Sequence, residues 1–150
     1  MMTIFNSSFE VSLRILLILY VTQDKISVDR IVAIDFIAVY GKDFGVSEDN
    51  LHGDNNYRFS EYAARRQMVS QAIKELVINN YIIPHVNKKG FCYSISDDGK
   101  SFCESLNDEY ANVYKSNLER ASKKFSSYSD RKMVQQINEY AVGMFGGDVQ

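Results

Sequence analysis

Cysteine and proline are scarce in this chain, and tryptophan is absent. Its 150 residues include only one proline and two cysteines. Because two cysteines do not make a disulfide framework, we expect a cytoplasmic protein. The longest apolar run, residues 15–21, is too short to span a bilayer, and it lacks the flanks of a secretory signal. The 17 Lys and Arg nearly balance the 19 Asp and Glu, which excludes a generally basic coat for nucleic acid.

Motifs for chemistry are also missing. The sequence contains no G-x-x-x-x-G-K-[ST] phosphate loop, so it does not predict a nucleotide hydrolase. His52 and His85 lie far apart, and neither has a cysteine or histidine at metal-ligand spacing. Cys92 and Cys103 fit small buried hydrophobic positions. We therefore expect a protein without catalytic residues, cofactor or metal.

Three helices are predicted in the first half of the chain. Ser7 and Glu10 have the spacing of a capping box in front of an apolar run, and Ser27 is placed to cap a second helix that ends near residue 41. Residues 42–59 form an acidic loop rich in turn-forming residues, and Ser60 is expected to cap a third helix that ends near residue 79.

A β-hairpin is predicted directly after the third helix. Two short runs of strand-forming residues, 81–86 and 91–95, flank a turn that ends at Gly90. Three helices, a hairpin and a further helix are the order of a winged helix-turn-helix domain, and the stretch from Asn79 to Phe102 is typical of its wing. The expected fold is thus mainly α with a small β-hairpin.

The rest of the chain is predicted to be helical. Amphipathic patterns cover about residues 108–125 and 129–142. The sequence therefore divides into a winged helix-turn-helix domain at 1–106, a C-terminal helical extension at 107–142 and a flexible tail at 143–150.

The third helix offers a surface that suits DNA. At about 100° per residue, its apolar positions define a buried face, and glutamine and lysine side chains lie opposite, where they could reach base edges. The wing adds lysines for phosphates. The candidate DNA contacts are Arg66, Gln67, Lys74, Lys88 and Lys89. An ordinary solvated face explains the same pattern, and the sequence leaves both readings open.

Arg65 differs from these residues, because the helical spacing places it on the buried side. A buried arginine requires a carboxylate partner. Asp35, an acid among apolar neighbours in the second helix, is the first candidate, and Asp43 is the next. We predict a structural ion pair between Arg65 and Asp35, in a network that Arg14 could share.

Two further regions suggest binding surfaces. Residues 111–135 hold six cationic against two acidic side chains, with aromatic residues between them, which fits either a phosphate-binding surface or the polar faces of exposed helices. The first helix is apolar around much of its circumference, so its surplus apolar surface must meet the C-terminal helices or another protein. The acidic loop contains two large anchors. The candidate partner contacts are Leu13, Leu17, Leu51 and Tyr57.

Several motifs resemble one known family. They are F-N-S-x-F-E-V-S-L-R-I-L at residues 5–16, D-R-I-V-A-I-D-F at 29–36 with D-F-G at 43–45, N-L-H-G-D-N at 50–55, and E-x3-R-R at 61–66. Over about residues 5–115 the chain is similar to the middle component of bacterial ABC-three-component systems. The Lamassu-type anti-phage and anti-plasmid defence systems are the best-known branch of that family.

The resemblance implies a non-catalytic accessory subunit. Its partners would be an ATPase of the SMC or Rad50 type that senses foreign DNA and an effector, often a nuclease, which the small subunit helps to regulate. Contact with DNA inside such a complex and the absence of a membrane partner are further expectations. The alternative is a winged-helix transcriptional regulator that binds an operator.

Overall fold

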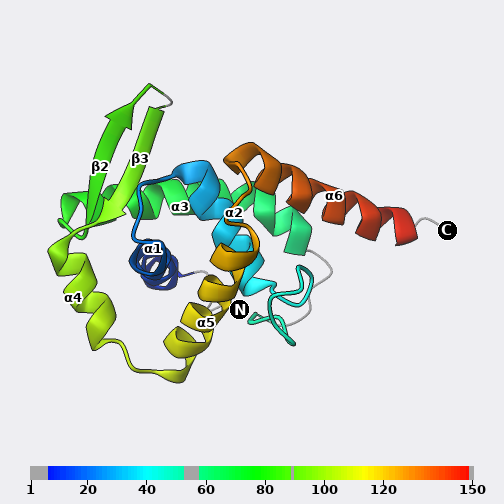
Figure 1. Ribbon diagram of the computed structural model, residues 1–150, viewed down its shortest axis with the longest axis horizontal. Coiled ribbons are helices and arrows are strands. Elements are labelled where there is room, and N and C mark those ends of the chain that lie inside the picture. The colour runs from blue at the N-terminus through cyan, green and yellow to red at the C-terminus, as the bar shows by residue number, and fades with distance from the viewer. Residues whose placement is uncertain (1–6, 53–57, 89, 149–150) are drawn as a thin grey trace.

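The computed structural model describes residues 7–52, 58–88 and 90–148. Within these ranges the chain forms six helices and one three-stranded antiparallel sheet (Figure 1). The mainly helical class with a small β-structure, expected from the sequence, is therefore confirmed. The elements in chain order are α1 (Ser8–Thr22), β1 (Ile26–Ser27), α2 (Val28–Val39), α3 (Arg58–Ile78), β2 (Ile82–Asn87), β3 (Gly90–Ile95), α4 (Asp97–Ser105), α5 (Glu109–Lys124) and α6 (Asp130–Asp148).

Side-chain caps fix the beginning of several helices. Ser7 Oγ accepts a hydrogen bond from the Glu10 amide at 3.2 Å, and Ser27 Oγ accepts one from the Arg30 amide at 3.1 Å, as their spacing predicts. The cap expected at Ser60 is wrong, because α3 already begins at Arg58. Ser96 caps α4 by accepting from the Gly99 amide at 3.0 Å, which the sequence reading missed.

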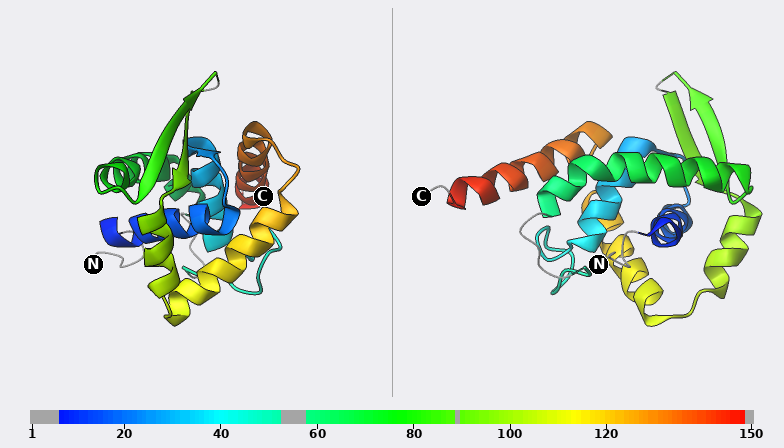
Figure 2. Two further views of the ribbon diagram at one scale, coloured as in Figure 1. Left: turned by 60° about the vertical axis from the view of Figure 1, so that its left-hand side comes forward. Right: turned by 180° about the vertical axis from the view of Figure 1, so that it is seen from behind.

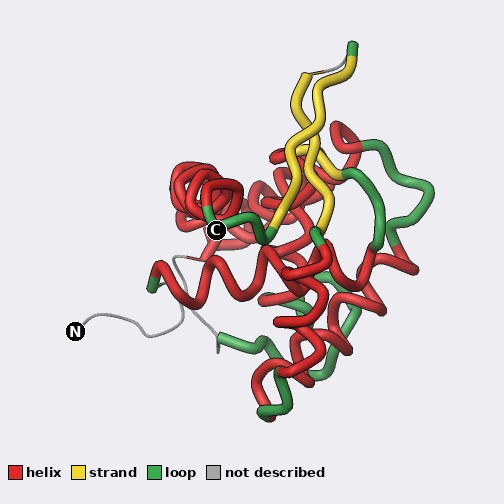
Figure 3. Tube along the Cα trace, turned by 90° about the vertical axis from the view of Figure 1, so that its left-hand side faces the viewer, coloured by secondary structure: helices red, strands yellow, loops and turns green. Residues whose placement is uncertain are grey.

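The predicted hairpin is present, and a third strand joins it. Strands β2 and β3 pair from Ile82 opposite Ile95 to Asn87 opposite Gly90, whose φ of +113° suits glycine in this tight turn. The short strand β1 pairs with Tyr93 and Cys92 of β3, which gives the sheet order β1-β3-β2. The upper half of the hairpin rises beyond the helices (Figures 2 and 3).

Helix α1 lies in the middle of the molecule, and Figure 1 views it nearly along its axis. It packs against α2, α3, α4, α5 and β3, so its own chain covers its apolar sides. Leu13 is 5% exposed and Leu17 is 0% exposed. Of the two covers expected for this helix, the C-terminal helices or another protein, the structure shows the first in α5, and it leaves little of either leucine exposed to a partner.

The C-terminal helices do not form a separate extension. Ala111, Tyr114 and Leu118 of α5 are fully buried against the helices of the first half. Helix α6 packs through Met133 and Ile137, and its far end points away from the body (Figures 1 and 2). It continues to Asp148, so residues 143–148, where the sequence predicts a flexible tail, are helical in the structure. Within the described ranges, no helix is both long and apolar enough to cross a membrane.

Candidate functional site

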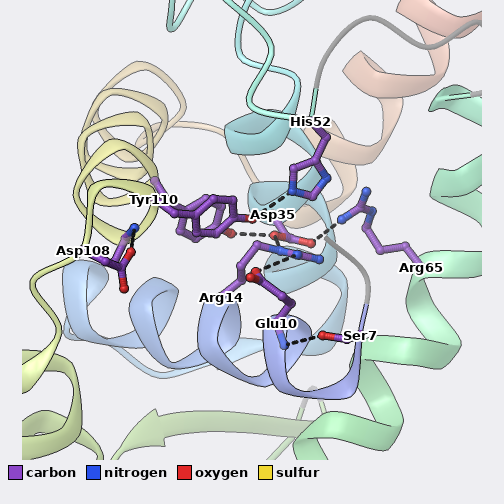
Figure 4. Close-up of polar contacts among 10 residues, drawn as sticks. Ser7, Glu10, Arg14, Asp35, His52, Arg65, Asp108 and Tyr110 are labelled. Atoms are coloured by element: carbon purple, nitrogen blue, oxygen red, sulfur yellow. Dashed lines mark hydrogen bonds and ion pairs between the residues drawn. The ribbon is translucent and has the colours of Figure 1, made fainter. Parts of the chain in front are cut away.

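The most concentrated polar chemistry in the described part of the chain is a network around Asp35. Helix α2 is buried from Ile31 to Val39, so the Asp35 carboxylate lies inside the protein. Arg14 Nε donates to its Oδ1 at 2.9 Å, and Arg65 Nη1 donates to its Oδ2 at 2.6 Å. Figure 4 shows the carboxylate between the two guanidinium groups. One acid thus connects α1, α2 and α3.

Both arginines have a second neighbour. Arg14 Nη1 lies 3.9 Å from Oε2 of Glu10, one helical turn earlier in α1. The guanidinium of Arg65 lies over the ring of Phe36, 5.5 Å from its centroid, in a cation–π arrangement. The charges of the two guanidinium groups are therefore balanced by the carboxylates of Asp35 and Glu10.

Two tyrosines and a histidine complete the network. The Tyr114 hydroxyl of α5 donates to Asp35 Oδ1 at 2.5 Å. Tyr110, one turn earlier, stacks against Tyr114, and its hydroxyl shares a 2.8 Å hydrogen bond with His52 Nε2 (Figure 4). The network therefore also joins α5 and the segment that ends at His52.

The surroundings set the protonation state of each group. Burial disfavours ionisation of Asp35, but the charges of Arg14 and Arg65 and the Tyr114 hydrogen bond outweigh it, so the pKa of Asp35 lies well below its usual range. Burial, reinforced by the charge of Arg14, lowers the pKa of His52 to about 3. Burial raises the pKa of Tyr110 to about 12. At neutral pH, Asp35 is charged, and His52 and Tyr110 are neutral.

This arrangement is suited to holding helices in register. Asp35 accepts hydrogen bonds from both arginines, and all three side chains are buried, so this charged centre is directed inward and is not presented to a substrate. A neutral His52 in a hydrogen bond with a high-pKa phenol is a poor proton donor at neutral pH. Among the described residues, no three His, Cys, Asp or Glu side chains are grouped so that they could hold a metal ion.

The structure brings Arg65 and Asp35 together, as the sequence predicts, and adds Arg14. It also places three partners that sequence reasoning missed, namely Tyr114, Tyr110 and His52. A signal for Tyr114 existed, because it shares the helical spacing of Ala111 and Leu118 and so lies on a buried face where its hydroxyl needs an acceptor. Nothing local to His52 indicates its contact with Tyr110.

The candidate DNA contacts lie outside this network. Arg66 is exposed on α3 but forms an ion pair with Asp29, in the first turn of α2. Gln67 and Lys74 are exposed on the same helix, and Lys88 is exposed at the turn of the hairpin. Lys89 lies outside the described residues. The structure thus separates these cations and neutralises one of them.

The remaining candidates are divided between contacts within the chain and undescribed residues. Leu51 is half-buried against the core, and its amide donates to the Val39 carbonyl at 2.7 Å. Tyr57 lies outside the described residues. In the cationic stretch, Lys124 Nζ donates to the Phe44 carbonyl at 2.6 Å, and Arg120 donates to the Val46 carbonyl at 3.4 Å. These two cations therefore fasten the segment after α2.

The fold and the network define a small, mainly helical protein whose interior charges serve its own architecture. The family follows from the sequence as a whole. The family model described as ABC-three component (ABC-3C) system Middle Component 2 matches residues 4–146, and the chain belongs to this family. A middle component of a three-component system has partner subunits. Neither the curated proteins nor the solved structures contain a match to this chain.

Proposed function

We propose that this protein is a non-catalytic accessory subunit of a defence complex of the Lamassu type. In this proposal it bridges an SMC- or Rad50-like ATPase and an effector of the nuclease type, and holds the effector inactive until the ATPase senses foreign DNA. The observation that carries the proposal is the family match over residues 4–146. The resemblance of the motifs at residues 5–66 adds the nature of the partners.

The architecture supports an assembly role. The order α1-β1-α2-α3-β2-β3, with the sheet order β1-β3-β2, is that of a winged helix-turn-helix domain, which we take this fold to be. Such domains also serve as protein-docking modules, so the fold alone does not require DNA reading. The ionisable side chains that the fold gathers are paired in the interior, which is consistent with a subunit that performs no chemistry.

Co-expression with the other two components of its system tests the proposal. The expected result is a complex that contains this chain and survives size-exclusion chromatography. Effector activity in that complex should depend on DNA and on the ATPase, and the isolated chain should hydrolyse neither ATP nor DNA. A chain that elutes alone in the presence of both components would contradict the proposal.

A second candidate function is a winged-helix transcriptional regulator. The observation that favours it is the exposed row of Gln67 and Lys74 on α3, the helix that reads the major groove in helix-turn-helix proteins. Selection of bound sequences from random duplexes distinguishes the two functions. A regulator would enrich a defined operator, whereas an accessory subunit would enrich none.

A further inference from the structure

The two faces of the β2–β3 hairpin differ in chemistry. On one face, three pairs of directly opposed residues are apolar: Ile82 with Ile95, Pro84 with Tyr93, and Val86 with Phe91. The pair nearest the body is buried, whereas Val86 is 73% exposed and Phe91 is 62% exposed. An apolar stripe thus begins in the core and ends on an exposed valine and phenylalanine at the tip.

The polar residues lie on the opposite face and bond within the hairpin. His85 Nε2 and Ser94 Oγ form a cross-strand hydrogen bond of 2.7 Å, and Asn87 Nδ2 donates to Cys92 Sγ at 3.6 Å. These contacts hold the strands together from one side. The exposed apolar pair lies on the other face and takes no part in these hydrogen bonds.

The position of the tip makes it accessible. Strand β1 pairs only with Tyr93 and Cys92, so the part of the hairpin above them extends beyond the body (Figures 2 and 3). Pro84 lies in β2, the edge strand of the sheet, and proline removes a donor from a strand. Pairing of a foreign strand along this edge is therefore disfavoured, and a partner would meet side chains instead.

The charge of the hairpin distinguishes it from the rest of the chain. Residues 81–96 contain no Asp or Glu and include Lys88 and Lys89, although the whole chain has a net charge of −2. We infer that the hairpin tip, formed by Val86, Phe91 and Lys88, is a docking anchor for another protein subunit. That subunit offers an apolar pocket with acidic side chains at its rim, and the inference rests on the proposed function because it assigns a surface to the assembly.

A protein partner fits the tip better than a DNA duplex does. Large apolar side chains at the centre with cations at the edge are the composition of a protein interface anchor. A DNA-binding wing would rely on a continuous basic surface with α3, but Arg66 is paired with Asp29 there. The tip therefore provides apolar contact area, and its lysine favours a partner whose pocket has a negatively charged rim.

The test uses the full chain co-expressed with the other two components, one of which carries an affinity tag. The double variant Val86→Thr/Phe91→Thr removes the apolar tip but keeps residues that favour strands. Ile83→Thr is the matched control, because Ile83 is 44% exposed on the opposite face of the same hairpin. We expect the double variant to bind about ten-fold more weakly or worse, and the control to bind as the parent does. Lys88→Glu should also weaken binding, most strongly at low salt.

Each outcome decides one claim. If the parent chain is retained and the double variant is retained equally, the anchor is overturned while the proposed function stands. If the parent chain binds neither component, both fall. If the double variant assembles normally but the complex loses duplex DNA binding, the tip serves DNA and protein docking is overturned. Circular dichroism checks folding, and should the double variant unfold, Lys88→Glu alone decides the matter, since unchanged binding would contradict the acidic rim.

Discussion

Asp35 is the residue on which the interior charges converge. Arg14, Arg65 and Tyr114 reach it from three helices, and together they hold its pKa below the usual range against the effect of burial. Buried ion pairs are costly to form but far more costly to break, because the remaining charge then lacks compensation. The network should therefore be sensitive to the loss of a single member.

Arg65→Ala tests this sensitivity. The substitution removes the 2.6 Å bond to Asp35 and leaves that carboxylate with one guanidinium in a buried site. We expect the free energy of unfolding to fall by about 3–5 kcal/mol, measured by urea denaturation.

The neighbouring residue provides the control for this prediction. Arg66 carries the same charge one position later, but its ion pair with Asp29 is exposed. Arg66→Ala should change stability by about 1 kcal/mol or less. Equal losses in the two variants would contradict a special role for the buried pair. Reduced DNA binding with unchanged stability in Arg65→Ala would instead assign Arg65 to a DNA surface.

His52 makes the stability of the protein dependent on pH. Its pKa is about 3 in the folded chain, because of burial first and the charge of Arg14 second, against about 6.5 in an unfolded chain. Between these values the unfolded state binds a proton that the folded state does not. Stability is therefore complete above about pH 6.5 and falls as the pH decreases toward 3.

His52→Gln isolates this contribution. The parent protein should lose up to about 1.4 kcal/mol more per pH unit than the variant between pH 6 and pH 4. Asp35 affects stability in a lower pH range. Its pKa is depressed in the folded protein, so its contribution to stability is complete above the pKa of an unfolded aspartate and is lost as the pH falls below that value. Denaturation curves at several pH values measure the difference. Parallel pH profiles of parent and variant would contradict the assignment to His52.

Contacts between single residues could be predicted from the sequence where the spacing within one helix determines which side chains are buried. The spacing of α3 placed Arg65 among buried positions, and Asp35 was the acid inside the apolar α2, so their pairing followed. The link from Tyr114 to Asp35 and from His52 to Tyr110 joins segments far apart in the chain. Such contacts depend on how α5 docks, which local periodicity does not specify.

At the scale of elements, the sequence predicted what local chemistry determines. Caps at Ser7 and Ser27 and the hairpin turn before Gly90 follow from side chains near each boundary. Strand β1 is two residues long and forms through its pairing with β3, so the sequence contains no alternating pattern that would predict it. For the same reason the sequence left open whether the C-terminal helices or another protein cover α1, and the packing of α5 against it shows that a C-terminal helix does so.

Arg30 of α2 connects the first half of the chain to the end of α5 and the start of α6, two helices that the sequence alone assigns to a C-terminal extension. From α2, its Nη1 donates to the Tyr128 carbonyl at 2.7 Å and contacts Asp130 at 3.2 Å, while Nη2 donates to the Phe125 carbonyl at 3.2 Å. It thereby satisfies two carbonyls of the connection between α5 and α6 and a carboxylate at the start of α6. Arg30 should therefore determine how firmly α6 is attached.

We expect Arg30→Ala to loosen α6 selectively. Loss of charge-assisted hydrogen bonds should lower the opening free energy of α6 by about 1.5 kcal/mol, which is about ten-fold faster amide exchange over residues 130–140. Exchange in α1 and α2 should stay nearly unchanged. Arg131→Ala removes an exposed cation from α6 itself and serves as the control. Uniformly faster exchange throughout the chain would contradict a local role for Arg30.

At the scale of the whole molecule, many cations serve internal contacts. Arg14 and Arg65 lie in the core, Arg30 holds the helix junction, and Arg120 and Lys124 hold the segment after α2. With a net charge of −2, the chain as a whole does not attract a polyanion over long range. The hypotheses of assembly subunit and operator-binding regulator therefore differ in a measurable property, the salt dependence of DNA binding.

The isolated protein should bind duplex DNA weakly and without sequence preference. Lys74 and Lys88 are exposed, and Lys89, next to Lys88 in the sequence, lies outside the described residues; we therefore expect about three phosphate contacts when Arg66 stays paired with Asp29. The logarithm of the binding constant should then fall with the logarithm of salt concentration with a slope of about −3 at the steepest, measured by fluorescence anisotropy. Lys74→Ala/Lys88→Ala should reduce that slope by about 2, whereas Arg66→Ala should change it little. A steeper slope together with nanomolar, sequence-selective binding at physiological salt would require a basic surface larger than these residues provide, and would favour the regulator.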